Sequence, residues 1–198
     1  MSRVLKRTMA VAALALPAAV QAAAGDWELS LGLMSVNADM DSPVLGVDAS
    51  DRVTPVINAS YFLTRQIALN TAAGIARHRF SLGGATLGRA SMAPLNLVAQ
   101  WHFLPEGRFR PYVGVGVHHT LFFDQEGPVF DQLARFKSDT GLVLQAGVSW
   151  SVSERYFINL DYKKFYLETD VRFSGAPARV ERLGLDPDVF SLAFGMRF

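Results

Sequence analysis

The sequence predicts an all-β fold, an eight-stranded antiparallel transmembrane β-barrel with short periplasmic turns and long extracellular loops. Three observations predict it: apolar residues recur at every second position in several segments, the residues between them are small or polar, and the connections alternate between short and long. The chain has 198 residues, of which 50% are hydrophobic. That is enough apolar material for one substantial domain, and it excludes an intrinsically disordered protein.

The N-terminal segment has the features of a bacterial secretory signal peptide. A basic start precedes the apolar run Met9–Val20, and small residues around Ala24 offer a cleavage site. The alternative is a membrane anchor, but this apolar run falls well short of the ~20 residues that a spanning helix needs. We therefore assign residues 1–24 to a cleaved signal peptide and residues 25–198 to the barrel. The mature chain then holds 16 basic and 18 acidic residues.

The composition excludes several classes of protein. Cysteine is absent, which excludes disulfide frameworks, zinc fingers, iron–sulfur clusters and thiol nucleophiles. The formal net charge of +1 gives no reason to expect nucleic acid as a partner. After Gly25 no stretch approaches 18 uninterrupted apolar residues, so transmembrane helices are excluded. We expect neither a metal site nor a cofactor.

The strands follow from the alternation along the chain. From Trp27 to Leu33 every second residue is bulky and apolar, whereas Glu28, Ser30 and Gly32 stand between them. Three further segments show the same strong pattern: Leu95–Phe103, Leu142–Trp150 and Phe190–Phe198. Weaker runs lie at Thr54–Thr64, Ile67–Phe80, Phe109–Phe123 and Tyr156–Thr169. Together they give eight strands, an even number as in bacterial outer-membrane barrels.

The connections between these strands alternate in length. Short turns are expected at residues 64–66, 104–108 and 153–155, and long loops at residues 38–51, 81–90, 124–139 and 170–187. Placing every long loop at one end is typical of an outer-membrane barrel. Inside the third long loop, Val129, Leu133 and Phe136 stand at roughly helical spacing and predict a short helix within Pro128–Lys137.

The residue types on the two faces decide which face points outward. A soluble lipocalin-like barrel or a β-sandwich would place the apolar face inward and a polar face in water. Here the second face is built from residues as small as Gly116, Gly147 and Ser191, which fit inside a narrow tube. Aromatic residues such as Trp101 and Trp150 stand near strand ends, as interfacial aromatics do. We therefore expect the bulky side chains to face lipid.

Several motifs in this order resemble those of the outer membrane protein W (OmpW) family. They are Pro94–Phe103, Phe109–Gly116, Phe122-Phe123-Asp124, Leu185–Phe190 and Gly195–Phe198. The resemblance implies a monomeric barrel with a narrow, largely hydrophobic cavity that passes small hydrophobic molecules towards the membrane through a lateral opening in the wall. A break in strand pairing would mark that opening.

The C-terminal strand and its surroundings imply further partners. The closing Phe198, with apolar residues at alternate positions before it, resembles the signal that the outer-membrane assembly machinery reads. Its simpler interpretation is a last lipid-facing strand, and both can hold. An integral outer-membrane protein also has membrane lipid and lipopolysaccharide as neighbours.

Catalysis is the third choice, because the sequence lacks the usual catalytic patterns. His118 and His119 alternate to opposite faces of a strand, so they cannot chelate one metal together. Lipid A deacylases are also small outer-membrane barrels, but their His-x-Ser-Asn pattern is absent from this sequence. A Gly-x-Ser-x-Gly elbow and a phosphate-binding loop are absent too. We therefore assign no catalytic residues and interpret the chain as a non-enzyme.

Two groups of site residues are predicted. Polar residues on the small face should form a hydrogen-bonded, charge-paired plug in the lumen, because buried charges require partners. The predicted plug residues are Glu28, Asn58, Asn70, Gln100, Asn159, Asp161, Lys163 and Arg197. Apolar residues near the extracellular end are the candidates for ligand contact, with loop packing or contact with the outer leaflet as the alternative. They are Phe122, Phe123, Phe130, Leu133, Phe136, Phe165 and Leu167.

The function that the resemblance implies is passive diffusion of small hydrophobic molecules through a narrow apolar channel with a lateral exit. A second class stays open: a structural or surface-interaction barrel whose loops bind phage, bacteriocin or host partners and whose lumen conducts nothing. An apolar cavity that opens near the outer leaflet would favour transport. Polar side chains along the whole tube would favour the structural class.

Overall fold

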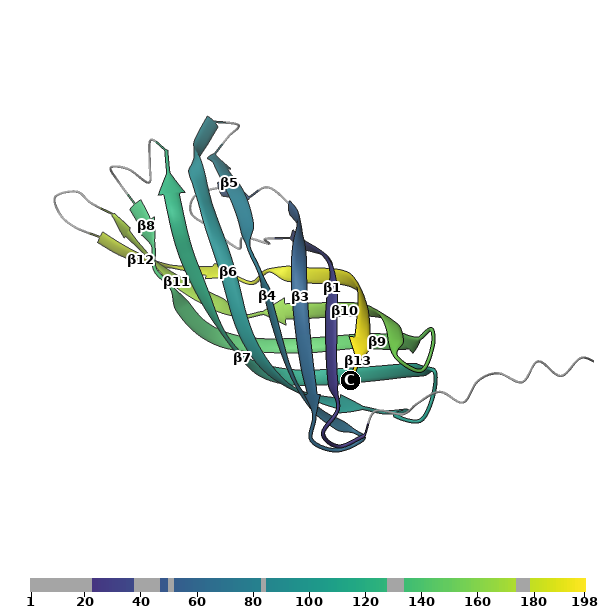
Figure 1. The fold of residues 1–198 in the computed structure, drawn as a ribbon. Helices are drawn as coiled ribbons and strands as arrows, with labels where there is room; N and C mark the ends of the chain where they lie inside the picture. Colours follow the sequence, from purple (N-terminus) through teal and green to yellow (C-terminus); the bar gives the residue numbers. More distant parts are fainter. Residues whose placement is uncertain (1–22, 38–46, 50–51, 83–84, 128–133, 174–178) are drawn as a thin grey trace, which may run out of the picture.

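The computed structural model describes residues 23–37, 47–49, 52–82, 85–127, 134–173 and 179–198, and these residues form a closed antiparallel barrel (Figure 1). Within these ranges no helix is long and apolar enough to cross a membrane. Most of the predicted signal peptide, residues 1–22, lies outside the described residues.

The strands of the described residues are β1 (Trp27–Asn37), β2 (Val47–Ala49), β3 (Arg52–Phe62), β4 (Ile67–Gly74), β5 (Ala76–Leu82), β6 (Ala85–His102), β7 (Phe109–Glu126), β8 (Ala134–Phe136), β9 (Asp139–Ser151), β10 (Tyr156–Phe165), β11 (Leu167–Phe173), β12 (Arg179–Leu185) and β13 (Asp188–Arg197).

Eight strands form the barrel wall, one of them consisting of two consecutive segments. They are β1, β3, β4 continued by β5, β6, β7, β9, β10 and β13, each paired antiparallel with its neighbours. The pairing of β6 with β7 joins the two ends of the sheet. Closure matters because a spanning sheet in lipid must satisfy its backbone groups internally and has no water to cover a free edge. The eight-stranded barrel predicted from the sequence is confirmed.

The alternation along β1 shows which face meets lipid. Leu29, Leu31 and Leu33 are exposed by 44%, 61% and 56%, whereas Glu28 and Ser30 are buried in the lumen. The same division holds on the last strand, where Phe194 is exposed and Ala193 is buried. Bulky apolar side chains therefore cover the outside, as expected, and small or polar side chains line the axis.

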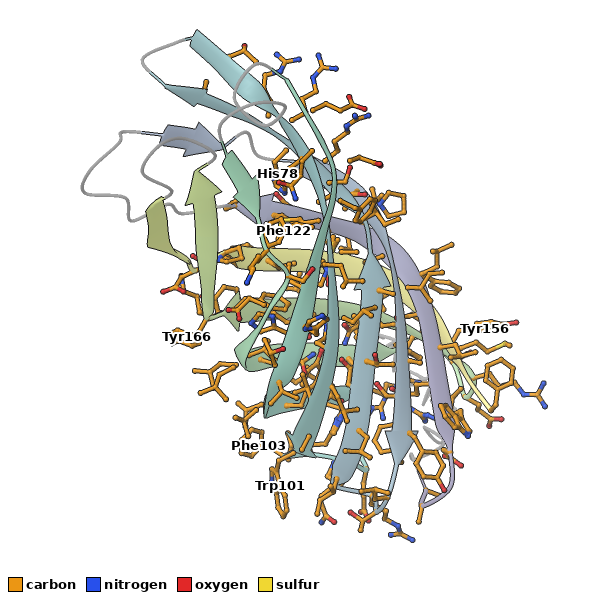
Figure 2. The ribbon with its side chains drawn as sticks, turned by 90° about the vertical axis from the view of Figure 1, so that its left-hand side faces the viewer. His78, Trp101, Phe103, Phe122, Tyr156 and Tyr166 are labelled. Carbon is orange, nitrogen blue, oxygen red and sulfur yellow. The ribbon has the colours of Figure 1, made fainter. Side chains whose placement is uncertain are left out.

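The end with the short turns carries the predicted aromatic residues. Trp27, Trp101, Phe103 and Trp150 are all about half exposed, and Figure 2 shows Trp101 and Phe103 projecting from the barrel at this end. The turns themselves are tight: the backbone N–H of Val152 donates to the carbonyl of Tyr156 across the β9–β10 connection, at 2.9 Å. This arrangement is typical of an interfacial aromatic girdle.

The opposite end differs from the sequence-based expectation. Much of the predicted loops 81–90 and 170–187 is strand. In the first, β5 ends only at Leu82 and β6 begins at Ala85, and in the second, β11 pairs with β12. β6 and β7 have 18 residues each, against the ~10 that cross a bilayer, so their upper parts extend well past the spanning segment (Figure 1). Backbone pairing between neighbouring strands continues there and stabilises the extension.

The helix predicted within Pro128–Lys137 is wrong in its described part. Residues 134–136 form β8, which pairs antiparallel with β11. A strand on the edge of β11 satisfies backbone groups that a short isolated helix would leave to water. Residues 128–133 of the predicted helix lie outside the described residues.

Charge placed on the outer face should destabilise the barrel according to depth. Leu31 lies in the middle of β1 and Leu104 in a short turn, and both side chains are exposed. We expect Leu31→Arg to cost about 2–4 kcal/mol of unfolding free energy in lipid vesicles and Leu104→Arg about 0–1 kcal/mol. Equilibrium urea unfolding of the two variants measures both values. Equal, near-zero costs would show that water rather than lipid surrounds β1.

Candidate functional site

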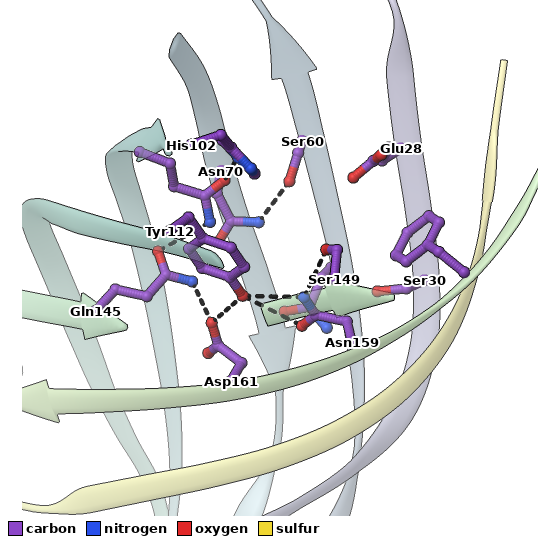
Figure 3. A pocket seen from close by; sticks show the side chains of 13 residues that line it. Glu28, Ser30, Ser60, Asn70, His102, Tyr112, Gln145, Ser149, Asn159 and Asp161 are labelled. Carbon is purple, nitrogen blue, oxygen red and sulfur yellow. Dashed lines mark hydrogen bonds between the residues drawn. The ribbon is translucent and has the colours of Figure 1, made fainter. Parts of the chain in front are cut away.

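The lumen has a polar layer on the side of the short turns and an apolar layer beyond it. Thirteen residues line the cavity of the polar layer, and the Tyr112 ring lies across it (Figure 3). They are Glu28, Ser30, Asn58, Ser60, Asn70, Gln100, His102, Tyr112, Gln145, Ser149, Phe157, Asn159 and Asp161.

A chain of hydrogen bonds crosses the polar layer. The Tyr112 hydroxyl donates to Asp161 Oδ2 at 2.6 Å, and Gln145 Nε2 donates to the same oxygen at 2.6 Å. Gln100 Nε2 in turn donates to Gln145 Oε1 at 3.0 Å. Lys163 forms an ion pair with Asp161 Oδ1. The network joins the neighbouring strands β6, β7, β9 and β10 along one side of the lumen, so polar side chains occupy much of the narrow bore there.

A second cluster of charges lies close to the short turns. Glu28 Oε1 accepts from Arg110 Nη2 at 2.7 Å, and from Arg197 Nε at 2.9 Å and Nη2 at 2.6 Å. All three side chains are at least 93% buried. One carboxylate thus neutralises only one of two guanidinium charges. Among the described residues, Arg110 Nε and Nη1 have no hydrogen-bond partner.

The eight predicted plug residues all belong to the barrel wall on its inner side. Seven are buried and Asn159 is partly buried, donating to Ser149 Oγ and to the Tyr112 hydroxyl at 3.0 Å each. The sequence interpretation missed Arg110, His102, Tyr112 and Gln145. Their strand positions, each one residue from an outward-facing apolar neighbour, carried the signal that would have found them.

Beyond the plug, apolar side chains pack across the lumen. Met34, Val36, Val56, Met92 and Val189 belong to one buried cluster. Two adjoining cavities lie among them and share three lining residues, Pro94, Phe165 and Val189. The cavity nearer the plug, called here the apolar cavity, has about 20 Å³ of free room, or about 330 Å³ when all empty space including open solvent is counted. Its lining residues are Met34, Val56, Ala72, Ala73, Gly74, Pro94, Asn96, Lys163, Phe165, Val189 and Ser191.

The predicted ligand residues divide between the two faces. Phe165 is buried and lines both cavities, and Phe122 packs against the same cluster. Phe123 is on the outer face, 36% exposed. Phe136 lies in β8 and Leu167 in β11, while Phe130 and Leu133 lie outside the described residues. The structure thus brings two of the seven, Phe122 and Phe165, to one apolar cluster.

Strand pairing is interrupted beside the apolar cavity. The β4–β6 ladder runs from Ile67–Trp101 to Asn70–Val98, and pairing with β6 resumes in the same register at Ala76–Met92 of β5. We call the intervening stretch, residues 71–75 facing residues 93–97, the seam. Pro94 lies within it and has no backbone N–H to donate to the ladder.

Side chains take over part of the missing backbone pairing. Asn96 Nδ2 donates to the Ala72 carbonyl across the seam at 3.4 Å, and Thr54 Oγ1 donates to the Ile75 carbonyl at 2.6 Å. Ala72 is buried and the next residue, Ala73, is exposed on the outer face, yet both line the apolar cavity. The cavity therefore lies directly against the wall at the seam.

The histidines do not assemble a metal site. His118 is buried, with Nδ1 at 3.1 Å from Thr120 Oγ1 and Nε2 at 3.0 Å from the Tyr166 carbonyl, whereas His119 is exposed. The prediction that these two residues face opposite ways is confirmed. In the part of the chain that the structure describes, no three His, Asp or Glu side chains gather as metal ligands would.

Comparison with known proteins identifies the family. The model of the OmpW family matches residues 20–198. The chain belongs to the OmpW family. An outer-membrane protein of Sinorhizobium fredii, y4mB, is 32% identical over 78% of this chain and 72% of its own. The dibenzothiophene metabolism operon protein PahQ of Pseudomonas aeruginosa is 26% identical over 87% of this chain and 88% of its own.

A solved structure agrees with the fold. The crystal structure of the outer membrane protein OprG from Pseudomonas aeruginosa has a TM-score of 0.76 and 18% identity, and the match covers 91% of this chain and 99% of that chain. This OmpW-family protein is therefore an integral outer-membrane barrel.

The charge cluster of this OmpW-family barrel should be sensitive to loss of its carboxylate. We expect Glu28→Gln to destabilise the protein by about 3–5 kcal/mol, because two buried guanidinium groups would lose their counter-charge. Glu106→Gln is the matched control, since Glu106 pairs with Arg65 while both are exposed, and should cost under about 1 kcal/mol. Urea unfolding in lipid measures both; equal costs would contradict the buried pairing.

Proposed function

We propose that this protein lets small hydrophobic molecules diffuse passively from the outer surface into the membrane, entering the apolar cavity and leaving sideways through the seam. The observation that carries the proposal is the coincidence of three features: interrupted pairing, a proline without an N–H, and a cavity lined by both an inner and an outer residue of β4. An apolar solute there exchanges water contact for side-chain contact, worth about 25 cal/mol per Å².

The polar layer supports the sideways exit. A solute that continued along the axis would have to displace the hydrogen bonds of Tyr112, Gln145 and Asp161 and offer nothing in return. Unsatisfied buried polar groups cost about 1–3 kcal/mol each. The seam opens instead onto an outer face of lipid-exposed residues such as Leu95 and Leu97. The route with the smaller barrier therefore leads into the bilayer.

The name of one relative agrees with this class of solute. PahQ is named for a dibenzothiophene metabolism operon, and dibenzothiophene is an apolar aromatic molecule. We extend only the chemical class to this chain: small, uncharged and largely apolar.

The proposal includes no catalysis and no cofactor. The protein would act as a monomer, because the closed sheet leaves no free edge in the spanning region. Export would use cleavage near residue 24, and the assembly machinery would read the C-terminal strand that ends at Phe198. Membrane lipid and lipopolysaccharide would surround the barrel.

A cysteine pair tests the seam. The shared register places Ala73 opposite Leu95, both on the outer face, and the chain has no cysteine of its own. We expect the double variant Ala73→Cys/Leu95→Cys to form a disulfide in the oxidising periplasm and lose most of the uptake, because the crosslink holds the seam shut. The measurement is the initial uptake rate of a radiolabelled alkane by a deletion strain carrying the variant.

Reductant provides the internal control for this variant. Treatment with a phosphine reductant should restore uptake to the rate of the single variants. The lateral route is wrong if the oxidised, crosslinked protein takes up alkane as fast as the reduced one. Uptake no faster than in the deletion strain, even for the unmodified protein, would favour the structural or surface-interaction class instead.

A further inference from the structure

One polar group in the apolar cavity has an unmet hydrogen-bond demand. Asn96 is 94% buried and lines the cavity, yet its Oδ1 has no hydrogen-bond partner among the residues that the structure describes. A buried amide oxygen without a donor costs about 1–3 kcal/mol. Such a group in a cavity is a natural contact for a ligand that brings a donor.

The orientation of the Asn96 amide follows from its neighbour across the seam. A backbone carbonyl can only accept, so the Ala72 carbonyl requires the nitrogen of the amide, and Nδ2 lies at 3.4 Å from it. The oxygen is then left for the cavity. Asn96 therefore offers an acceptor to an occupant while its other end crosses the seam.

The remaining lining limits the charge of that occupant. Besides Asn96, the polar side chains of the lining belong to Lys163 and Ser191. Lys163 is already paired with Asp161 in the plug, so the cavity presents no uncompensated charge from this lysine. An ionised ligand would lose its hydration without gaining a counter-charge. The cavity thus suits a neutral molecule.

We propose that Asn96 makes the channel selective for hydrophobic molecules that carry one neutral hydroxyl group, such as medium-chain alcohols or phenols. The hydroxyl donates its hydrogen to Asn96 Oδ1, and the apolar body packs against Met34, Val56 and Phe165, which line the same cavity. This selectivity rests on the proposed function, in which the apolar cavity is the entrance to the seam.

Paired probes of equal chain length test the inference. The deletion strain carries the full chain, the variant Asn96→Leu, or the control Leu144→Val, whose side chain is 44% exposed on the outer face of β9, away from the seam. Initial uptake of labelled 1-octanol and n-octane is measured for each. We expect Asn96→Leu to lower the ratio of 1-octanol uptake to n-octane uptake about three- to tenfold, the worth of one buried hydrogen bond. Loss of the Asn96–Ala72 contact across the seam acts on both probes alike and does not change this ratio. The control should change neither rate.

A second measurement does not depend on a variant that folds. In lipid nanodiscs, 1-octanol should shift the side-chain amide resonances of Asn96 in the unmodified protein, and n-octane should shift them less. Equal shifts from both probes, or equal losses of both uptake rates in Asn96→Leu, would overturn the selectivity while leaving the conduit intact. Absence of uptake of either probe by the unmodified protein would overturn the conduit itself.

Discussion

Each spanning strand turns one of its faces towards the acyl chains of the lipid. Because side chains alternate along a strand, its remaining side chains point into a lumen enclosed by only eight strands. The leucines of β1 cover the outside, so the side chain of Glu28, which alternates with them on the same strand, points into the lumen. At that place little water is available to solvate a charge, and partners have to come from other strands. Arg110 of β7 and Arg197 of β13 supply them.

This pairing divides the lumen into two environments. The layer near the short turns satisfies its charges with contacts that join strands distant in sequence, and it thereby fills the tube. The layer beyond it contains a cluster of apolar residues from Met34 to Val189 and needs no such network. The seam lies beside the second layer, where an opening costs few hydrogen bonds because Pro94 supplies no donor and Asn96 and Thr54 compensate two carbonyls.

The alternation predicted the strands and their outward faces correctly, because a two-residue period is a local property of the chain. Partners across the lumen are not local. The predicted plug includes Glu28 and Arg197 but omits Arg110; alternation after Phe109 places Arg110 on the inner face, yet it cannot show that Arg110 pairs with Glu28. The sequence pattern does not predict the seam either, because Leu95, Asn96 and Leu97 alternate through it without a change of pattern. Residues 81–90 were interpreted as a loop because the pairing of β5 with β6 there does not require alternation.

The plug also affects the passage of polar solutes through the barrel. A water-filled pore as wide as that of a porin would leak metabolites and admit small polar antibiotics in proportion to its copy number. Here the Glu28–Arg110 pair joins opposite sides of the barrel, and the bonded side chains from Gln100 to Asp161 cover one wall, so ions and water have little free bore. On the proposed route, a cell could raise its permeability to oils without making its envelope more permeable to salts and sugars.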